Sequence, residues 1–262
     1  MVSKVMTKPL KILVIPDTHL KPYIFDRADK ILADGKADYA ICLGDYVDEW
    51  DCGGKPGMYQ EHLERMLKFM YDHPETEWLI GNHDFAYLHP DVGCSGHSKQ
   101  CEGIVNQYFA RMKNKFKVIV RRGKVIFSHA GLTQSYVERQ YAKALEQYSD
   151  PKLKFGFHLS GEIEDYVIND INLVAFSEHN YKDLWEDDSP LWARPQTGVE
   201  PMFKPEYLQV VGHTPLKHIE EINGVLSTDA FSLYSWYPYP PYGEEKFVIV
   251  NCSDGTWEKV DE

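Results

Sequence analysis

The feature that most constrains this chain is a series of short apolar runs that alternate with longer amphipathic stretches. Each run is rich in β-branched residues and is closed by turn-forming or polar residues, which favours buried strands. The runs lie at residues 11–15, 39–43, 78–80, 118–120, 125–127, 208–211, 225–226 and 247–250. Between them, residues 58–71 and 104–115 carry apolar side chains at spacings of three and four, which is typical of helices with one buried face. This alternation predicts a layered α/β fold.

The stretch from about residue 133 to residue 205 differs from the rest, because it has helical patterns and no clear strand run. One helical face within it is apolar, formed by Ile163, Tyr166, Val167, Ile171 and Val174. We therefore predict a mostly helical insertion or cap within a single domain that spans residues 1–262. Near the end of the chain, Asp254 and Gly255 predict the tip of a hairpin.

Charge and composition exclude several classes of protein. The formal net charge is −12, from 40 acidic and 28 basic residues. This charge argues against electrostatic binding of nucleic acid over a broad surface. Metal ions do not enter this count, so a local positive site stays possible. No apolar run approaches the roughly 20 residues that span a bilayer. The first residues are too polar for a signal peptide, so we expect a cytoplasmic protein with no membrane partner.

The cysteines point to the same compartment. Their number, five, is odd, which suggests reduced thiols rather than a disulfide framework. Cys94, His97 and Cys101 lie close together in the sequence, but their spacing matches no common zinc motif. Their role is left open by the sequence.

Five of the predicted strands end in a motif that contains Asp, Asn or His. The motifs are Pro16-Asp17-Thr18-His19, Gly44-Asp45-Tyr46-Val47-Asp48, Gly81-Asn82-His83-Asp84, Ser128-His129-Ala130-Gly131 and Gly212-His213-Thr214-Pro215. Each motif alone is a weak signal, because Asp-x-His is more often a turn than a ligand pair. In open α/β sheets, however, ligands gather outside the carboxyl ends of the strands. Five such motifs in the same setting predict one shared site.

The chemistry of these residues suits two divalent metal ions. Oxygen and imidazole ligands without thiolate fit Mn, Fe, Zn, Ni or Mg, and imidazole favours the transition metals. Asn82 is a poor general base but a good neutral oxygen ligand. A carboxylate such as Asp45 can bridge two cations about 3.5–4 Å apart. The resulting excess of positive charge would attract phosphate despite the acidic exterior.

Taken together and in this order, the five motifs resemble the blocks of the calcineurin-like metallophosphoesterase family. They extend over residues 17–215, which is most of the chain. The resemblance implies an α/β fold of four layers, α/β/β/α, with a central pair of sheets flanked by helices, and a dinuclear metal site. It assigns the metal ligands by position: Asp17 and His19 to the first metal, Asp45 as the bridge, and Asn82, His129 and His213 to the second.

The resemblance also implies the catalytic residues. His83 would be the general acid, and Asp48 would hold its imidazole in orientation. This role is physically reasonable, because a carboxylate beside a histidine raises the pKa of the imidazole and fixes its tautomer. A water molecule that bridges the two metals would be the nucleophile.

The sequence departs from parts of the family at three positions and resembles one branch of it at a fourth. Pro215 stands where many phosphodiesterase members have a second histidine, as in the branch that resembles protein phosphatases and dinucleoside polyphosphatases. Glu49 and Ile80 stand where that branch has two phosphate-binding arginines. Arg194 lies in a Leu-Trp-x-Arg stretch that resembles bacterial and phage phosphatases of this branch. Its planar fork suits two phosphate oxygens, so we predict a phosphate contact, the alternative being a surface arginine beside a packed tryptophan.

The leading functional prediction is a metal-dependent phosphomonoesterase that uses two divalent ions, with Mn as the first choice. Its substrate would be a phosphorylated small molecule, a nucleotide or a phosphopeptide. A phosphodiesterase or nuclease with the same metals is the alternative, although the missing second histidine and the acidic charge count against it. A non-enzymatic binding module on the same fold is the third hypothesis, against which the presence of His83 argues. The natural substrate, the native metal and the oligomeric state are not fixed by the sequence.

Overall fold

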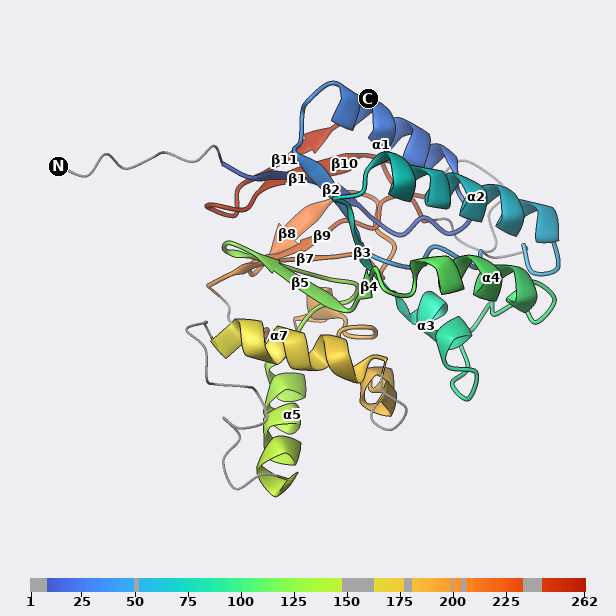
Figure 1. Cartoon of the computed structure of the whole chain (residues 1–262). Helices are drawn as coiled ribbons and strands as arrows, with labels where there is room; N and C mark the ends of the chain where they lie inside the picture. The colour runs from blue at the N-terminus through green and yellow to red at the C-terminus, as the bar shows by residue number, and fades with distance from the viewer. Residues whose placement is uncertain are drawn as a thin grey trace.

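The computed structural model of this chain describes residues 9–49, 52–147, 163–176, 181–198, 200–203, 206–232 and 242–262. In this part of the chain, two β-sheets lie face to face and helices cover their outer faces (Figure 1). The architecture is the four-layer α/β/β/α sandwich that the sequence predicts.

The first sheet has six strands in the order β11-β10-β1-β2-β3-β4. The strands β1 to β4 run parallel, and β10 and β11 add an antiparallel edge beside β1. The bounds are β1 Lys11–Ile15, β2 Tyr39–Cys42, β3 Glu77–Leu79, β4 Phe116–Lys117, β10 Phe247–Asn251 and β11 Trp257–Val260.

The second sheet has five strands in the order β5-β6-β7-β9-β8. Its central strands β6, β7 and β9 are parallel, and the outer strands β5 and β8 pair antiparallel with their neighbours. The bounds are β5 Ile119–Arg122, β6 Val125–Ser128, β7 Leu208–Val211, β8 Glu220–Ile222 and β9 Val225–Ser227.

The core follows from the alternation of side chains along each strand. In β1, Ile12 and Val14 pack into the cluster between the two sheets, with Phe127 of the second sheet. Leu13 and Ile15 belong to the other buried cluster, which includes the apolar faces of the helices. Because both faces of β1 are covered, the strand is a continuous apolar run, as parallel strands usually are.

Helices α1 (Tyr23–Ala33), α2 (Pro56–Asp72) and α4 (Glu102–Met112) lie on the six-stranded side of the molecule (Figure 1). Helix α2 begins at Pro56, whose fixed φ suits the first turn of a helix. Its predicted range was 58–71, so the prediction was within two residues of the observed ends. Helix α4 ends three residues before the predicted residue 115, which is within the uncertainty of helix ends from sequence.

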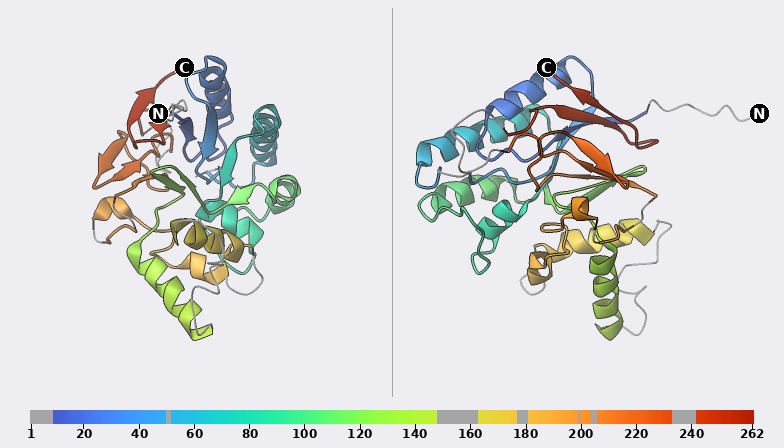
Figure 2. Two further views of the ribbon diagram at one scale, coloured as in Figure 1. Left: turned by 60° about the vertical axis from the view of Figure 1, so that its left-hand side comes forward. Right: turned by 180° about the vertical axis from the view of Figure 1, so that it is seen from behind.

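Residues 200–203 are not helical, but the other described parts of the segment predicted as a helical insertion all contain helices. These are α5 (Gln134–Gln147), α7 (Ile163–Val174) and two short 3₁₀ turns, η1 (Tyr181–Trp185) and η2 (Pro195–Thr197). Within the described residues of this segment, strand pairing is limited to one isolated bridge, Thr133 with Met202. Both α5 and α7 lie on the side of the five-stranded sheet away from α1 and α2 (Figure 2).

Asn172 attaches helix α7 to the start of β5. Its Oδ1 accepts hydrogen bonds from the backbone N–H groups of Val118 and Ile119 at 2.6 and 3.1 Å, and its Nδ2 donates to the Ile119 carbonyl at 2.8 Å. These bonds satisfy backbone groups at the edge of the sheet. The insertion is therefore fixed to the sandwich by a side chain as well as by apolar packing.

Four elements were not predicted from the sequence. Helix α1 was missed although Ile24, Phe25, Ala28 and Ile31 are buried at helical spacing, because charged residues lie between them. Strand β8 is exposed along its whole length, so its sequence has no apolar face that would indicate a strand. Strand β4 has two residues, which is too short for a pattern. Helix α3 (Asn82–Leu88) begins inside the Gly81-Asn82-His83-Asp84 motif, where no helix was predicted. The predicted aromatic loop after residue 234 lies mostly outside the described residues.

His62 of α2 is a buried histidine, and it should make the stability of the folded protein depend on pH in the acid range. Its Nε2 lies 3.3 Å from Thr18 Oγ1, and burial lowers the pKa of His62 to about 3. In the unfolded chain, His62 has the ordinary histidine pKa of about 6.5. The free energy of unfolding is therefore unaffected by this group above that pH, and it falls as the pH drops from about 6.5 toward 3, because the unfolded chain then binds the proton more readily.

We expect His62→Gln to lose part of this acid sensitivity, on the order of a few kcal/mol between pH 6.5 and pH 4. The measurement is denaturant unfolding of chelator-treated protein at several pH values. His218→Gln is the matched control, because the His218 side chain is 77% exposed and its loss should leave the slope unchanged. Equal slopes in the wild type and in His62→Gln would contradict the prediction.

No helix in the described parts of the chain is both long enough and apolar enough to cross a bilayer.

Candidate active site

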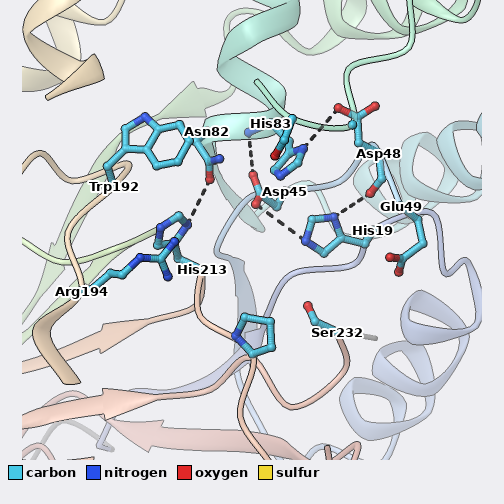
Figure 3. A pocket seen from close by; sticks show the side chains of 13 residues that line it. His19, Asp45, Asp48, Glu49, Asn82, His83, Trp192, Arg194, His213 and Ser232 are labelled. Atoms are coloured by element: carbon cyan, nitrogen blue, oxygen red, sulfur yellow. Dashed lines mark hydrogen bonds and ion pairs between the residues drawn. The ribbon is translucent and has the colours of Figure 1, made fainter. Parts of the chain in front are cut away.

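Four of the five strand-end motifs line a pocket at one edge of the sandwich (Figure 3). The other motif contributes His129, which is buried beside Asp45. Backbone conformation there is unusual. His19, Asp45, Asp48 and His213 all have positive φ, between 37° and 66°. Such conformations cost about 1–3 kcal/mol each in non-glycine residues and persist where surrounding structure enforces them. Their concentration in these loops marks a functional site.

Asp45 lies at the centre of the site. Its Oδ1 accepts a hydrogen bond from the backbone N–H of His83, in the first turn of α3, at 2.9 Å. Its Oδ2 lies 3.3 Å from His129 Nε2 and 3.7 Å from His19 Nε2. Burial opposes ionisation, but His129 and His83 together lower the pKa of Asp45 below its ordinary range. The Asp45 carboxylate therefore faces both halves of the site at once.

One half of the site is formed by Asn82, His129 and His213. Asn82 Oδ1 lies 3.0 Å from His129 Nε2 and 3.1 Å from His213 Nδ1, and the two nitrogens are 3.1 Å apart. His129 Nδ1 donates to the Leu43 carbonyl, so Nε2 presents its lone pair to the site. A spacing of about 3 Å is the edge of an octahedron with bonds of roughly 2.1 Å, so these atoms fit one divalent cation.

The other half is formed by Asp17, His19 and Asp45, whose ligand atoms all lie within 4.8 Å of one another. His19 Nδ1 donates to the Asp48 carbonyl at 2.7 Å, which leaves the Nε2 lone pair facing the two carboxylates. Asp17 is fully buried. Its Oδ2 accepts the His213 N–H at 2.9 Å, and its Oδ1 has no hydrogen-bond partner among the described residues. Burial raises the pKa of Asp17, and nearby carboxylates raise it further.

Two glycines make room for these carboxylates. A Cβ on Gly81 would lie 2.1 Å from Asp45 Oδ1, and a Cβ on Gly212 would lie 2.0 Å from Asp17 Oδ1. No side chain fits at either position without moving the carboxylate. The glycines of the Gly-Asn-His-Asp and Gly-His-Thr motifs are thus required by close packing around the candidate ligands.

The carboxylate, amide and imidazole atoms of the two groups fit two divalent cations. Buried carboxylates and imidazole lone pairs face inward in both groups, and an unpaired buried charge of this kind is costly without a cation. The two groups share Asp45 and contain no thiolate, which suits ions such as Mn. Every residue that the sequence assigns to the metals is therefore brought to this pocket edge.

His83 and Asp48 form a pair beside the candidate ligands. His83 Nδ1 lies 3.3 Å from Asp48 Oδ2, while Asp48 Oδ1 accepts hydrogen bonds from the hydroxyls of Tyr59 and Tyr87 at 2.8 and 2.6 Å. Burial opposes protonation, but Asp45, Asp48 and the nearby sulfur of Cys94 raise the pKa of His83 well above its ordinary value. The imidazole is thus oriented and favours its protonated form, as a general acid requires.

Arg194 reaches the same pocket from the helical insertion. Its side chain is exposed, and its guanidinium donates to Thr214 Oγ1 at 2.7 Å, next to His213 (Figure 3). The preceding Trp192 meets the His213 ring edge to face, with centroids 5.6 Å apart. Pro215 also lines the pocket. The insertion thereby supplies one wall of the site, with a cation at its rim.

Glu49, which stands where the resemblance leads us to expect an arginine, also lines the pocket. It forms an ion pair with the largely buried Lys21. This part of the wall therefore carries a carboxylate and an ammonium group that balance each other. The expected arginine contact has no direct replacement at position 49.

Asp84, the last residue of the Gly-Asn-His-Asp motif, has a role that was not predicted from the sequence. The Asp84 carboxylate accepts hydrogen bonds from the backbone N–H groups of Asp45, Tyr46 and Gly81 at 2.7, 2.9 and 2.9 Å. It joins the loop after β2 to the start of α3. The sequence pattern that could have indicated this role is an acidic residue three positions after a glycine at the start of a helix, which is typical of helix capping.

The loop that follows α3 is held by packing rather than by metal. His89 stacks on Tyr181 with ring centroids 4.0 Å apart, and His97 stacks on Tyr87 at 4.1 Å. Cys94 accepts a hydrogen bond from Asn82 Nδ2 at 3.3 Å. Among the described residues, Cys94, His97 and Cys101 do not gather into a group that could hold an ion.

A two-sheet α/β sandwich whose strand ends carry this donor set defines a metal-dependent hydrolase of phosphate esters. The comparison with family models agrees. The model of the calcineurin-like phosphoesterases matches residues 10–236, so the chain belongs to that family. The family implies divalent metal ions, and the reaction of this chain is metal-dependent phosphoester hydrolysis.

Solved structures give the same fold, and 56 chains match. A cold-active protein tyrosine phosphatase at 1.1 Å is 16% identical with a TM-score of 0.54, and the match covers 97% of this chain and 80% of that one. A cold-active protein-tyrosine phosphatase of a psychrophilic Shewanella species gives the same identity and TM-score, with 97% and 81% covered. At this identity the likeness concerns the fold alone. No curated protein sequence matches the chain.

Proposed function

We propose that this chain is a phosphomonoesterase that works with two divalent metal ions, Mn being the first candidate. The residues that would hold the ions are Asp17, His19, Asp45, Asn82, His129 and His213. The substrate would be a phosphorylated small molecule, a nucleotide or a phosphopeptide. The two groups of inward-facing donors that share Asp45 support this assignment.

The proposed chemistry divides between the ions and the side chains. When bound, the ions would polarise the phosphoryl oxygens and lower the pKa of a water molecule enough for attack on phosphorus. His83, which lines the pocket, would donate a proton to the leaving oxygen. Asp48 holds the His83 imidazole in place, and two tyrosine hydroxyls hold Asp48 in turn.

The observation that carries the preference for a monoester is the position of Arg194. Its guanidinium lies at the pocket rim beside His213, where it can contact the non-bridging oxygens of a phosphate group. A monoester dianion gains more from this cation than a diester monoanion does. Pro215 at the pocket wall agrees with the monoester branch, because it supplies no further imidazole.

A phosphodiesterase is the second candidate, and one observation favours it. The Glu49 carboxylate lines the pocket. Lys21 forms an ion pair with Glu49, so its charge is already compensated. Among the described residues, this part of the wall offers no unpaired cation, which suits a less charged substrate. The balance between Arg194 and Glu49 therefore decides between the two activities.

The deciding experiment compares p-nitrophenyl phosphate with bis-p-nitrophenyl phosphate on chelator-stripped protein. Mn, Ni, Zn and Mg are added back singly, and turnover is followed by the release of p-nitrophenol. Monoester turnover restored by Mn would support the proposal. A clear preference for the diester would replace it with the second candidate, and turnover that survives the chelator would contradict both.

We expect Arg194→Ala to lower kcat/KM for the monoester roughly 10- to 100-fold. A hydrogen bond to a charged group contributes about 1.5–3 kcal/mol, and each 1.4 kcal/mol corresponds to a factor of ten. Inorganic phosphate should also become a weaker competitive inhibitor. The measurement is steady-state kinetics with both p-nitrophenyl substrates.

Two controls define the result for Arg194. Arg194→Lys keeps the charge without the planar fork, so it should recover part of the loss. Diester turnover should change less than monoester turnover in Arg194→Ala. An equal loss on both substrates, with unchanged phosphate inhibition, would mean that Arg194 does not contact the phosphate.

The proposal also covers the domain organisation, the cellular compartment and the first phosphopeptide to test. The chain would be one domain over residues 1–262, with the helical insertion as its substrate-side wall. The five cysteines, which all lie in the described part of the chain, form no disulfide bonds, which agrees with a reducing, cytoplasmic compartment. Trp192 offers an aromatic surface in the pocket, so a phosphotyrosine peptide is a suitable first phosphopeptide, as the names of the two structural neighbours also suggest.

A further inference from the structure

A sixth strand end delivers an acidic side chain to the site, and no sequence motif marks it. Asp229 lies two residues after β9, which pairs in parallel with β7 through Val211 and Ser227. Its position therefore corresponds to that of the Gly-His-Thr loop after β7. The side chain of Asp229 is 1% exposed, so its carboxylate is inside the protein.

The two carboxylate oxygens of Asp229 differ in their environment. Oδ1 accepts hydrogen bonds from the backbone N–H and the hydroxyl of Ser232 at 3.2 and 2.6 Å. Oδ2 is buried and has no hydrogen-bond partner among the described residues. One oxygen thus anchors the side chain, and the other has a vacant acceptor position. Ser232 itself lines the pocket (Figure 3).

Ser232, which binds Asp229, lines the same pocket as His19 and Asp45, so Asp229 lies beside the group formed by Asp17, His19 and Asp45. Among the charged neighbours of Asp17, it has the largest effect on the pKa of that carboxyl group, which it raises. His19 and Lys21 are the basic groups that face Asp229. Lys21 is paired with Glu49, and His19 donates its Nδ1 proton to a backbone carbonyl, which leaves a lone pair on Nε2.

This arrangement concentrates negative charge at one end of the site. Three carboxylates are buried near the first metal position, whereas the other position has neutral donors apart from the shared Asp45. Buried carboxylates are stable only when they are paired or when a metal compensates them. The first position also has few protein ligands, so water would complete its coordination.

We propose that Asp229 is a positioning residue of the first metal position, where its free Oδ2 accepts a hydrogen bond from a water molecule in the coordination shell of the ion. The inference rests on the two-metal site of the proposed function. Outer carboxylates of this kind orient the ligands and raise the affinity, and their loss typically costs 10- to 100-fold in metal binding.

The test is Mn²⁺ titration of chelator-stripped protein, with bound and free Mn²⁺ measured by electron paramagnetic resonance. Asp229→Asn keeps an oxygen for both Ser232 bonds and replaces the other carboxylate oxygen with an NH₂ group, which carries no charge and cannot accept a hydrogen bond. We expect the wild type to bind two ions, and the variant to bind one of them about 10- to 100-fold more weakly. Asp72→Asn removes an exposed carboxylate and should leave both affinities unchanged.

Thermal unfolding separates this role from a structural one. Without metal, Asp229→Asn should be at least as stable as the wild type, because one of several buried like charges is removed. With saturating Mn²⁺, the increase in Tm should be smaller than in the wild type. A fall in Tm of the same size with and without Mn²⁺ would mean that Asp229 only holds the loop.

The outcomes are distinguishable from a failure of the proposed function. Two unchanged Mn²⁺ affinities in Asp229→Asn, beside a wild type that binds two ions, would overturn the inference and leave the proposed function intact. A wild type that binds fewer than two ions would overturn both, and the titration would reveal this before any variant is compared.

Discussion

Replacing Asp45 with Asn is expected to lower kcat for phosphate ester hydrolysis on the order of 10³-fold or more. Asp45 belongs to both groups of candidate ligands, with Oδ2 facing His129 and His19. Metal ions contribute several kcal/mol of charge stabilisation in the transition state, and each 1.36 kcal/mol is tenfold in rate. One substitution at the shared carboxylate therefore weakens both ions.

The measurement for Asp45→Asn combines kcat with the metal content of the protein after dialysis against Mn²⁺. We expect fewer than two ions per chain and no recovery of the full rate at higher Mn²⁺. Asp72→Asn again serves as the control for the loss of one carboxylate, because its Lys68 pair is exposed and is worth little. A variant that retains two ions and the wild-type rate would remove Asp45 from the metal site.

The second large effect is expected at His83. His83→Gln removes the proton donor but leaves the candidate metal ligands in place, so Mn²⁺ content should stay at the wild-type level. General acid catalysis contributes about 10²- to 10⁴-fold, so kcat should fall within that range for substrates whose leaving group needs a proton. With p-nitrophenol, which leaves readily as an anion, the loss should be much smaller.

A series of aryl phosphates with leaving groups of increasing pKa tests this prediction for His83. The wild-type rate should depend weakly on the pKa of the leaving group, and the His83→Gln rate should depend on it steeply. Asp48→Asn keeps the imidazole but loosens its orientation, so it should give an intermediate dependence. If His83→Gln lost the same factor for every leaving group, His83 would not be the general acid.

The strands and the candidate ligands were predictable because short-range patterns encode them. Strands β1 and β7 were predicted at their observed bounds, since a strand buried on both faces is a continuous apolar run. The motifs after the strands were readable because few structural reasons exist for a histidine at that point. Their convergence followed from a general property of α/β sheets rather than from any contact in the sequence.

Two of the elements that were missed, β8 and α3, have little sequence pattern of their own. The exposed strand β8 is a strand because β9 offers it hydrogen-bond partners, which no local sequence signal records. Helix α3 begins inside a motif that reads equally well as a turn, and its first turn donates the His83 N–H to Asp45. In both cases a distant part of the chain decides the local structure.

The sequence by itself determined the class of fold, the family and the residues that gather at the site, because burial patterns and residue chemistry are local properties. The tertiary structure alone decided which atoms face which. It directs His129 Nε2, rather than Nδ1, toward the site, makes Asp84 the link between two loops, pairs Glu49 with Lys21, and brings Asp229 to a site that no motif connects to it. These relations depend on distances between residues far apart in the chain, and such distances exist only after the two sheets have packed together.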